Sequence, residues 1–194
     1  MYTQGLTSAS FSLALERNTG GYIAFGGLPP VSGISSSTSF TSTPIQYLSF
    51  FNPDQYTFYA ITASIKYNEK PSSNEQYIVD SGTTLIHAPT ALAKQINAAF
   101  SPAAQYLSDY GAYFVDCHAK PPTFEVNIAG TSFTVNPVDL IYQSQVEPKT
   151  GLCLTGVQDG GSGPYILGDV FLQNVIAVFD VGANEMRFAA HEKY

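Results

Sequence analysis

The sequence has few positive charges. Its 194 residues include 8 Lys and Arg against 15 Asp and Glu, which gives a formal net charge of −7. An acidic chain is a poor partner for the phosphates of nucleic acids or of anionic membranes, so we expect it to bind neither. There is also no apolar run of about 18 residues, which excludes a transmembrane helix. The first residues lack the basic and apolar segments of a signal peptide, so we expect a secreted form to have lost its leader.

Cysteine is scarce as well. Cys117 and Cys153 are too far apart for a Cys-x-x-Cys pair, and they are either a disulfide or two unrelated buried thiols. Asp116, Cys117 and His118 bring three metal-ligand types together, but no second cluster lies at metal-site spacing, so we expect no metal here. The glycine-rich segment 159–163 lacks the Gly-Lys-Ser/Thr ending of a phosphate loop and is predicted to be a turn.

Aromatic residues and chain breakers are abundant. The chain has 13 Tyr, 13 Phe, 16 Gly and 12 Pro, while only 12% of its residues are charged. This composition favours an all-β chain of many short strands. Together with the segment patterns described below, we expect a mostly antiparallel fold with one or two short helices. A hydrophobic content of 44% is enough for a substantial core, and we expect residues 1–194 to form a single domain.

The most informative stretch is Tyr-Ile-Val-Asp-Ser-Gly-Thr-Thr-Leu-Ile at residues 77–86. Apolar residues on both sides of a polar turn predict a buried strand, a tight loop and a second buried strand. The loop presents Asp80 next to Gly82, which permits backbone conformations closed to other residues. Ser81, Thr83 and Thr84 supply short hydroxyls that can donate to a carboxylate. A capped turn in an all-β protein would also fit these five residues.

Other segments complete the predicted fold. Segment 11–25 reads as a β-hairpin, residues 29–44 as a loop, and residues 44–51 and 56–67 as strands. Thr90 is predicted to cap a helix over residues 91–100. Further strands are expected at 113–117, 123–128 and 131–135, followed by a short helix from Asp169 and a hairpin ending at Phe188.

A second motif lies near the end of the chain. Ile166, Leu167, Gly168 and Asp169 are followed by Phe171 and then by Val-Phe-Asp at 178–180. Together with the loop at Asp80, in this order, the motif resembles the C-terminal lobe of pepsin-like aspartic proteases of the fungal type. The resemblance extends from about residue 11 to residue 188. It covers only half of that family's architecture, because a second Asp-Ser/Thr-Gly and a flap hairpin are not found in the sequence.

The resemblance implies a role for each matching residue. Asp80 is one of two catalytic carboxylates, which activate a water molecule between them. Ser81 helps to lock the loop to its counterpart, Gly82 gives backbone access, Thr83 orients the carboxylate and Thr84 lies beside the substrate. The residues expected to support the loop from behind are Ile166, Leu167 and Gly168. The resemblance also implies a disulfide between Cys117 and Cys153.

The implied function is that of the C-terminal lobe of a secreted or vacuolar aspartic endopeptidase, which acts on peptides or proteins in acid and requires no cofactor. Its partner would be the N-terminal lobe, without which we expect the chain to be inactive and to self-associate weakly. Two alternatives remain. A retroviral-protease-like homodimer would bring two copies of Asp80 together, and a non-catalytic binding module would use the same fold without chemistry. The intact motif at residues 80–84 counts against the binding module.

Overall fold

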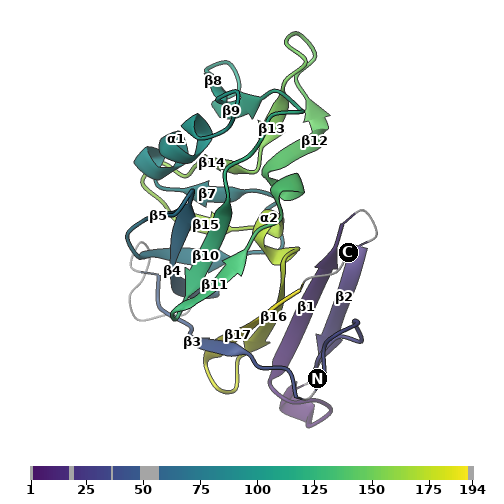
Figure 1. Cartoon of the computed structure of the whole chain (residues 1–194). Helices are drawn as coiled ribbons and strands as arrows, with labels where there is room; N and C mark the ends of the chain where they lie inside the picture. Colours follow the sequence, from purple (N-terminus) through teal and green to yellow (C-terminus); the bar gives the residue numbers. More distant parts are fainter. Residues whose placement is uncertain (1, 18–19, 36, 49–56, 192–194) are drawn as a thin grey trace.

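The computed structural model describes residues 2–17, 20–35, 37–48 and 57–191 (Figure 1). Strands dominate these residues, as the composition indicated, and most strand pairs are antiparallel. The all-β fold class predicted for one lobe of a pepsin-like protease is therefore confirmed. No helix in these ranges has the length and apolar character needed to cross a membrane.

One antiparallel sheet of five strands, with the order β2-β1-β16-β17-β3, lies at one end of the molecule (Figure 1, lower part). It contains both expected hairpins, at residues 11–25 and at the end of the chain. The expected loop at 29–44 ends earlier than predicted, because its last four residues pair with β17. The bounds are β1 Ser10–Glu16, β2 Gly20–Phe25, β3 Thr41–Pro44, β16 Val175–Asp180 and β17 Glu185–Ala190, with a short 3-10 helix η1 at Tyr2–Gln4.

The second sheet holds the segment around Asp80 and runs in the order β11-β10-β4-β6-β15-β7-β14, with β5 paired to β4. Two pairs in it are parallel, β6 with β15 and β7 with β14, so the late strand β15 lies between β6 and β7. The bounds are β4 Ala60–Tyr67, β5 Lys70–Pro71, β6 Glu75–Val79, β7 Ile86–Ala88, β10 Phe124–Ile128, β11 Thr131–Thr134, β14 Val157–Asp159 and β15 Tyr165–Leu167.

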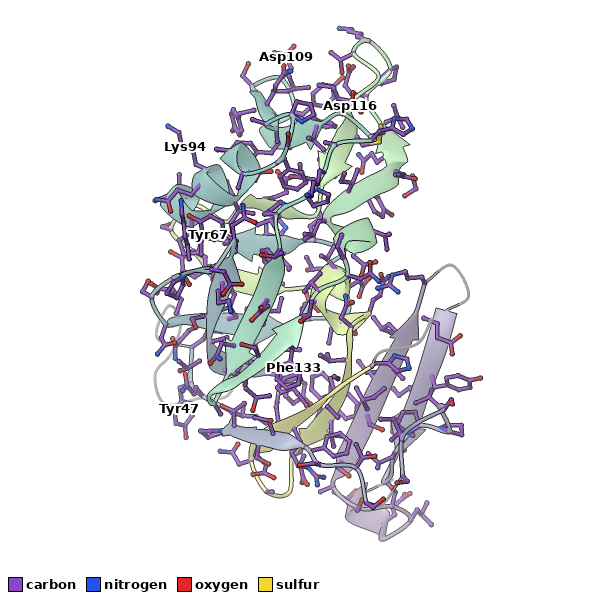
Figure 2. All side chains as sticks on the ribbon, viewed as in Figure 1. Tyr47, Tyr67, Lys94, Asp109, Asp116 and Phe133 are labelled. Carbon is purple, nitrogen blue, oxygen red and sulfur yellow. A yellow bond between two sulfur atoms is a disulfide. The ribbon has the colours of Figure 1, made fainter. Side chains whose placement is uncertain are left out.

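A third sheet of four strands, β12-β13-β9-β8, lies at the opposite end of the molecule. The disulfide between Cys117 and Cys153, drawn in yellow near Asp116 in Figure 2, joins the chain after β9 to β13, which confirms the pairing. The bounds are β8 Gln105–Leu107, β9 Ala112–Val115, β12 Ile141–Val146 and β13 Cys153–Thr155.

Three local predictions need correction. A strand was expected at 44–51, but β3 ends at Pro44 and residues 45–48 form no strand. Gln46 makes only a single bridge with Ala60, and residues 49–51 lie outside the described residues. The next strand begins at Ala60, four residues later than expected, and residue 56 is not described. Thr90 is not a helix cap, because Pro89 holds that position and the Thr90 hydroxyl donates to Asp159 instead.

The helices are short and lie beside the sheets. The helix expected after residue 90 and the short helix expected from Asp169 are both confirmed. Phe171 on the second of these helices is fully buried and packs against Phe188 of β17, which joins the five-stranded sheet to the core. The bounds are α1 Thr90–Ala98, the 3-10 helix η2 Pro137–Leu140 and α2 Asp169–Leu172.

Candidate active site

The loop that carries Asp80 joins two strands that are not neighbours in the sheet. It leaves β6 after the buried Val79 and enters β7 at the buried Ile86, with β15 between the two strands. The Asp80 backbone N–H donates to the carbonyl oxygen of Leu167 on β15 at 3.1 Å. Buried strands on both sides and β15 behind it therefore fix where the loop begins and ends.

Both oxygens of the Asp80 carboxylate accept a hydrogen bond from the loop itself. The Gly82 N–H donates to Oδ1 at 2.9 Å, and the Thr83 hydroxyl donates to Oδ2 at 2.6 Å. Asp80 is partly exposed, so the carboxylate is oriented but still accessible. An ionised carboxylate has about four acceptor positions, and the described residues occupy two of these, which leaves two for a water or a substrate group.

The remaining loop residues point in different directions. Ser81 and Thr84 are exposed, whereas Thr83 is partly buried. Thr84 also lines a cavity of about 470 Å³ whose wall includes Asp169 and Tyr142. The loop thus brings Asp80 and Thr83 together and leaves Ser81 and Thr84 facing outward.

The segment expected behind the loop lies against it. Leu167 is fully buried and is opposite Val79 in the parallel pair of β15 and β6, and the partly buried Ile166 is opposite Ile78. Just beyond β15, two N–H groups at the start of α2 donate to the loop: Asp169 to Thr83 O at 2.8 Å and Val170 to Thr84 O at 3.0 Å.

Gly168 sits where the two chain segments are closest. A Cβ built there would lie less than 3.0 Å from the carbonyl oxygens of Thr83 and Leu85, both of them backbone atoms. The loop can approach β15 this closely only because residue 168 has no side chain.

We therefore expect Gly168→Ala to destabilise the fold by about 1–3 kcal/mol, since the added methyl group must push the loop away. Urea unfolding followed by circular dichroism measures this. Gly27→Ala is the matched control, because no atom of the described residues lies within 4 Å of a Cβ at that position; its effect should stay within about 0.5 kcal/mol. Equal midpoints for the two variants would contradict the close contact.

Asp169 is a second carboxylate near Asp80. Burial raises the pKa of Asp169 to about 6, and the negative charge of Asp80 adds to the increase. Its Oδ1 atom is buried and accepts no hydrogen bond within the described residues, which fits the raised value. Sequence reasoning placed Asp169 in the second motif and at the start of the short helix, but gave its carboxylate no role. The available signal was its position in the sequence. Asp169 directly follows the apolar-apolar-Gly segment, and that segment was expected to pack behind the loop of another carboxylate.

This raised pKa makes stability depend on pH. The unfolded chain releases the Asp169 proton near the ordinary value of 3.8, whereas the folded chain keeps it to about 6. The folded state therefore binds more protons than the unfolded state between these pH values, so stability falls as the pH rises through them. The upper limit of this fall is about 3 kcal/mol, and solvent screening reduces it because Asp169 is only half buried.

We expect Asp169→Asn to flatten this decline of stability with pH. Urea unfolding at a series of pH values tests it, with the exposed Asp109→Asn as a control for lost charge; an unchanged slope would refute it.

No group of three or more His, Cys, Asp or Glu side chains that could hold a metal ion occurs in the part of the chain that the structure describes. In the sequence cluster at 116–118, Cys117 is committed to the disulfide. His118 is almost fully exposed and interacts with Asp116 at its own turn.

Comparisons with known proteins find similar sequences along nearly the whole chain. The family model described as "Eukaryotic aspartyl protease" matches residues 1–191. A probable aspartic-type endopeptidase of Aspergillus fumigatus is 42% identical over 98% of this chain and 46% of its own length. An acid protease of Saccharomycopsis fibuligera is 31% identical over 96% of this chain and 48% of its own. Penicillopepsin-2 of Penicillium janthinellum is 31% identical over 95% of this chain and 44% of its own length. The chain thus spans about half the length of these relatives.

Proposed function

Because this chain belongs to the eukaryotic aspartyl protease family, we propose that it forms, as one domain over residues 1–194, the C-terminal lobe of a pepsin-like endopeptidase. In this role Asp80 is one catalytic carboxylate, and an N-terminal lobe supplies the other. The observation that carries the proposal is the Asp80 carboxylate itself, partly exposed at a loop tip and held by Gly82 and Thr83.

Two carboxylates are needed for the reaction. Two such groups a few ångströms apart cannot both ionise, so one keeps a proton while the other acts as base toward a water between them. The Thr83 hydroxyl and the Gly82 N–H keep the Asp80 carboxylate in one orientation, so that its free acceptor positions face the water. The exposed Ser81 contacts the matching loop of the other lobe, and the exposed Thr84 contacts the peptide substrate.

An exposed surface on β2 supports a partner lobe. β2 is an edge strand of the five-stranded sheet, and its Tyr22, Ile23 and Phe25 side chains are 45%, 54% and 56% exposed. An apolar edge strand is a site for pairing with another chain segment. We propose that the N-terminal lobe covers it, and that the chain alone self-associates weakly through it.

The proposed compartment is extracellular or vacuolar. Disulfides persist in oxidising compartments, and the bond between Cys117 and Cys153 fits such an environment. The low content of basic residues also limits charge repulsion when carboxylates become protonated in acid.

Complementation with a second lobe tests the proposal. The N-terminal half of the Aspergillus fumigatus relative, co-expressed with this chain, should yield an assembly that hydrolyses a denatured protein at about pH 3 to 5, with a bell-shaped pH profile. New amino termini in the substrate are the readout. An assembly that forms and binds peptides but cuts none would overturn the proposal in favour of a binding module.

A further inference from the structure

Three residues far apart in the sequence form one buried polar network. Arg17 follows β1, Asp139 lies in η2, and Asn174 follows α2. The Arg17 guanidinium donates to both carboxylate oxygens of Asp139 through Nε and Nη2, and Nη2 also donates to Asn174 Oδ1 at 3.1 Å. Asn174 Nδ2 in turn donates to Asp139 Oδ2 at 2.8 Å. Each of the three side chains is thus bonded to the other two.

The network is largely withdrawn from solvent. Asp139 and Asn174 are 9% and 7% exposed, and the Arg17 side chain is 17% exposed. A buried ion pair is weak evidence for added stability, because the cost of removing its charges from water offsets much of their attraction. Its geometry, with two parallel bonds and a third to an amide, is instead suited to fixing positions.

Asn174 connects this network to α2. Its Nδ2 group also donates to Val170 O at 2.9 Å, and its Oδ1 accepts the Asn136 N–H at 2.9 Å. The helix has only four residues, too few to be stable by itself. Its orientation therefore depends on tertiary contacts: its buried side chains pack in the core, and Asn174 ties its C-terminal end by hydrogen bonds.

The other end of α2 holds the loop of Asp80. The N–H groups of Asp169 and Val170 donate to Thr83 O and Thr84 O, and the Thr83 hydroxyl donates to the Asp80 carboxylate. A continuous path of hydrogen bonds and one helical turn thus runs from Arg17 to Asp80. Figure 1 shows α2 between the five-stranded sheet and the strands β7 and β15.

We propose that Arg17, Asp139 and Asn174 are positioning residues for Asp80, acting through α2 on the loop that carries it. Catalytic groups must be held to within about 0.5 Å of the productive geometry, so a helix that tilts would misplace the carboxylate. The catalytic part of this inference rests on the proposed function, whereas the anchoring of α2 does not.

Hydrogen exchange in the chain itself tests the anchoring. Asn174→Ala should lower the protection of the Asp169 and Val170 amides about tenfold relative to amides in β10 and β11, because local opening of α2 becomes easier. Asn97→Ala is the matched control. Asn97 is also buried, and its Nδ2 also donates to the carbonyl four residues earlier, Ala93 O, and to a second element at Val157 O. Asn97→Ala should leave the protection of the Asp169 and Val170 amides unchanged relative to that of the amides in β10 and β11.

Arg17→Lys is a milder second variant, which keeps the charge but loses the guanidinium fork. It should produce a smaller loss of protection at the same two amides, and it keeps the proposal testable if Asn174→Ala does not fold. If these variants instead lowered the exchange protection of all amides evenly, as expected for the control, the network would be merely structural and the proposal would be overturned.

Kinetics in the two-lobe assembly test the catalytic consequence. Asn174→Ala should lower kcat about 10- to 100-fold with little change in KM, as expected when a reacting group is displaced and substrate contacts remain. Asn97→Ala should retain the normal kcat. An unchanged kcat for Asn174→Ala in an active assembly would overturn the inference. An assembly in which even the unmodified chain is inactive would instead count against the proposed function and leave the exchange result standing.

Discussion

In an assembly of this chain with an N-terminal lobe, Asp80→Asn should lower kcat about 10²- to 10⁴-fold. The amide cannot accept the proton of the attacking water, although it has nearly the same shape as the carboxylate. The Gly82 N–H can still donate to the Asn oxygen, so we expect stability to change by less than about 1 kcal/mol. Initial rates of peptide hydrolysis and urea unfolding of the same samples measure the two effects.

The control for this variant is Asp159→Asn. The Asp159 carboxylate also accepts a hydrogen bond from a glycine N–H two residues later and one from a threonine hydroxyl, here Gly161 and Thr90, both to Oδ1 at 2.7 Å. This change should leave kcat nearly unaltered. Comparable losses of kcat in Asp80→Asn and Asp159→Asn would mean that the effect is structural and that Asp80 is not a catalytic residue. In the chain alone, Asp80→Asn should also lower the pKa of Asp169, because the Asp80 charge helps to raise it.

Loss of the disulfide is expected to have the largest effect on stability. The bond between Cys117 and Cys153 closes a loop of 36 residues, and such a constraint on the unfolded chain contributes about 4 kcal/mol. Cys153 is fully buried on β13, which pairs with β9, so reduction also leaves a free thiol inside the core. Urea unfolding with and without a reductant should show a large shift of the midpoint to lower urea.

The double variant Cys117→Ser/Cys153→Ser serves as the control, since a reductant should have no further effect on it. Intact mass of the oxidised protein should be two hydrogens below that of the reduced form. Free reaction of both thiols with an alkylating agent in the denatured, unreduced protein would show that the bond is absent.

The local structure around Asp80 was largely predictable. Apolar residues at 77–79 and 85–86 indicated the two buried strands, and the short helix from Asp169 was visible in its pattern. These features depend on neighbours in the sequence. The disulfide was predicted only through the family resemblance, because two cysteines by themselves left both states open.

The features that sequence reasoning missed depend on contacts between distant segments. Arg17 and Asp139 are 122 residues apart, and no pattern in the chain links them. Thr90 looked like a helix cap, but its hydroxyl faces Asp159 on a strand 69 residues later. The raised pKa of Asp169 likewise follows from burial behind the loop, which only the packing of β15 and α2 reveals.

The dependence of peptidase activity on protein concentration tests the central claim most directly. Initial rates are measured in acid for this chain alone and for this chain titrated with an N-terminal lobe. We expect no hydrolysis by the chain alone at any concentration, and in the titration a rate that rises with the lobe and levels off at one lobe per chain. Activity of the chain alone that increases with the square of its concentration would contradict this, because it would show that two copies of Asp80 complete the site.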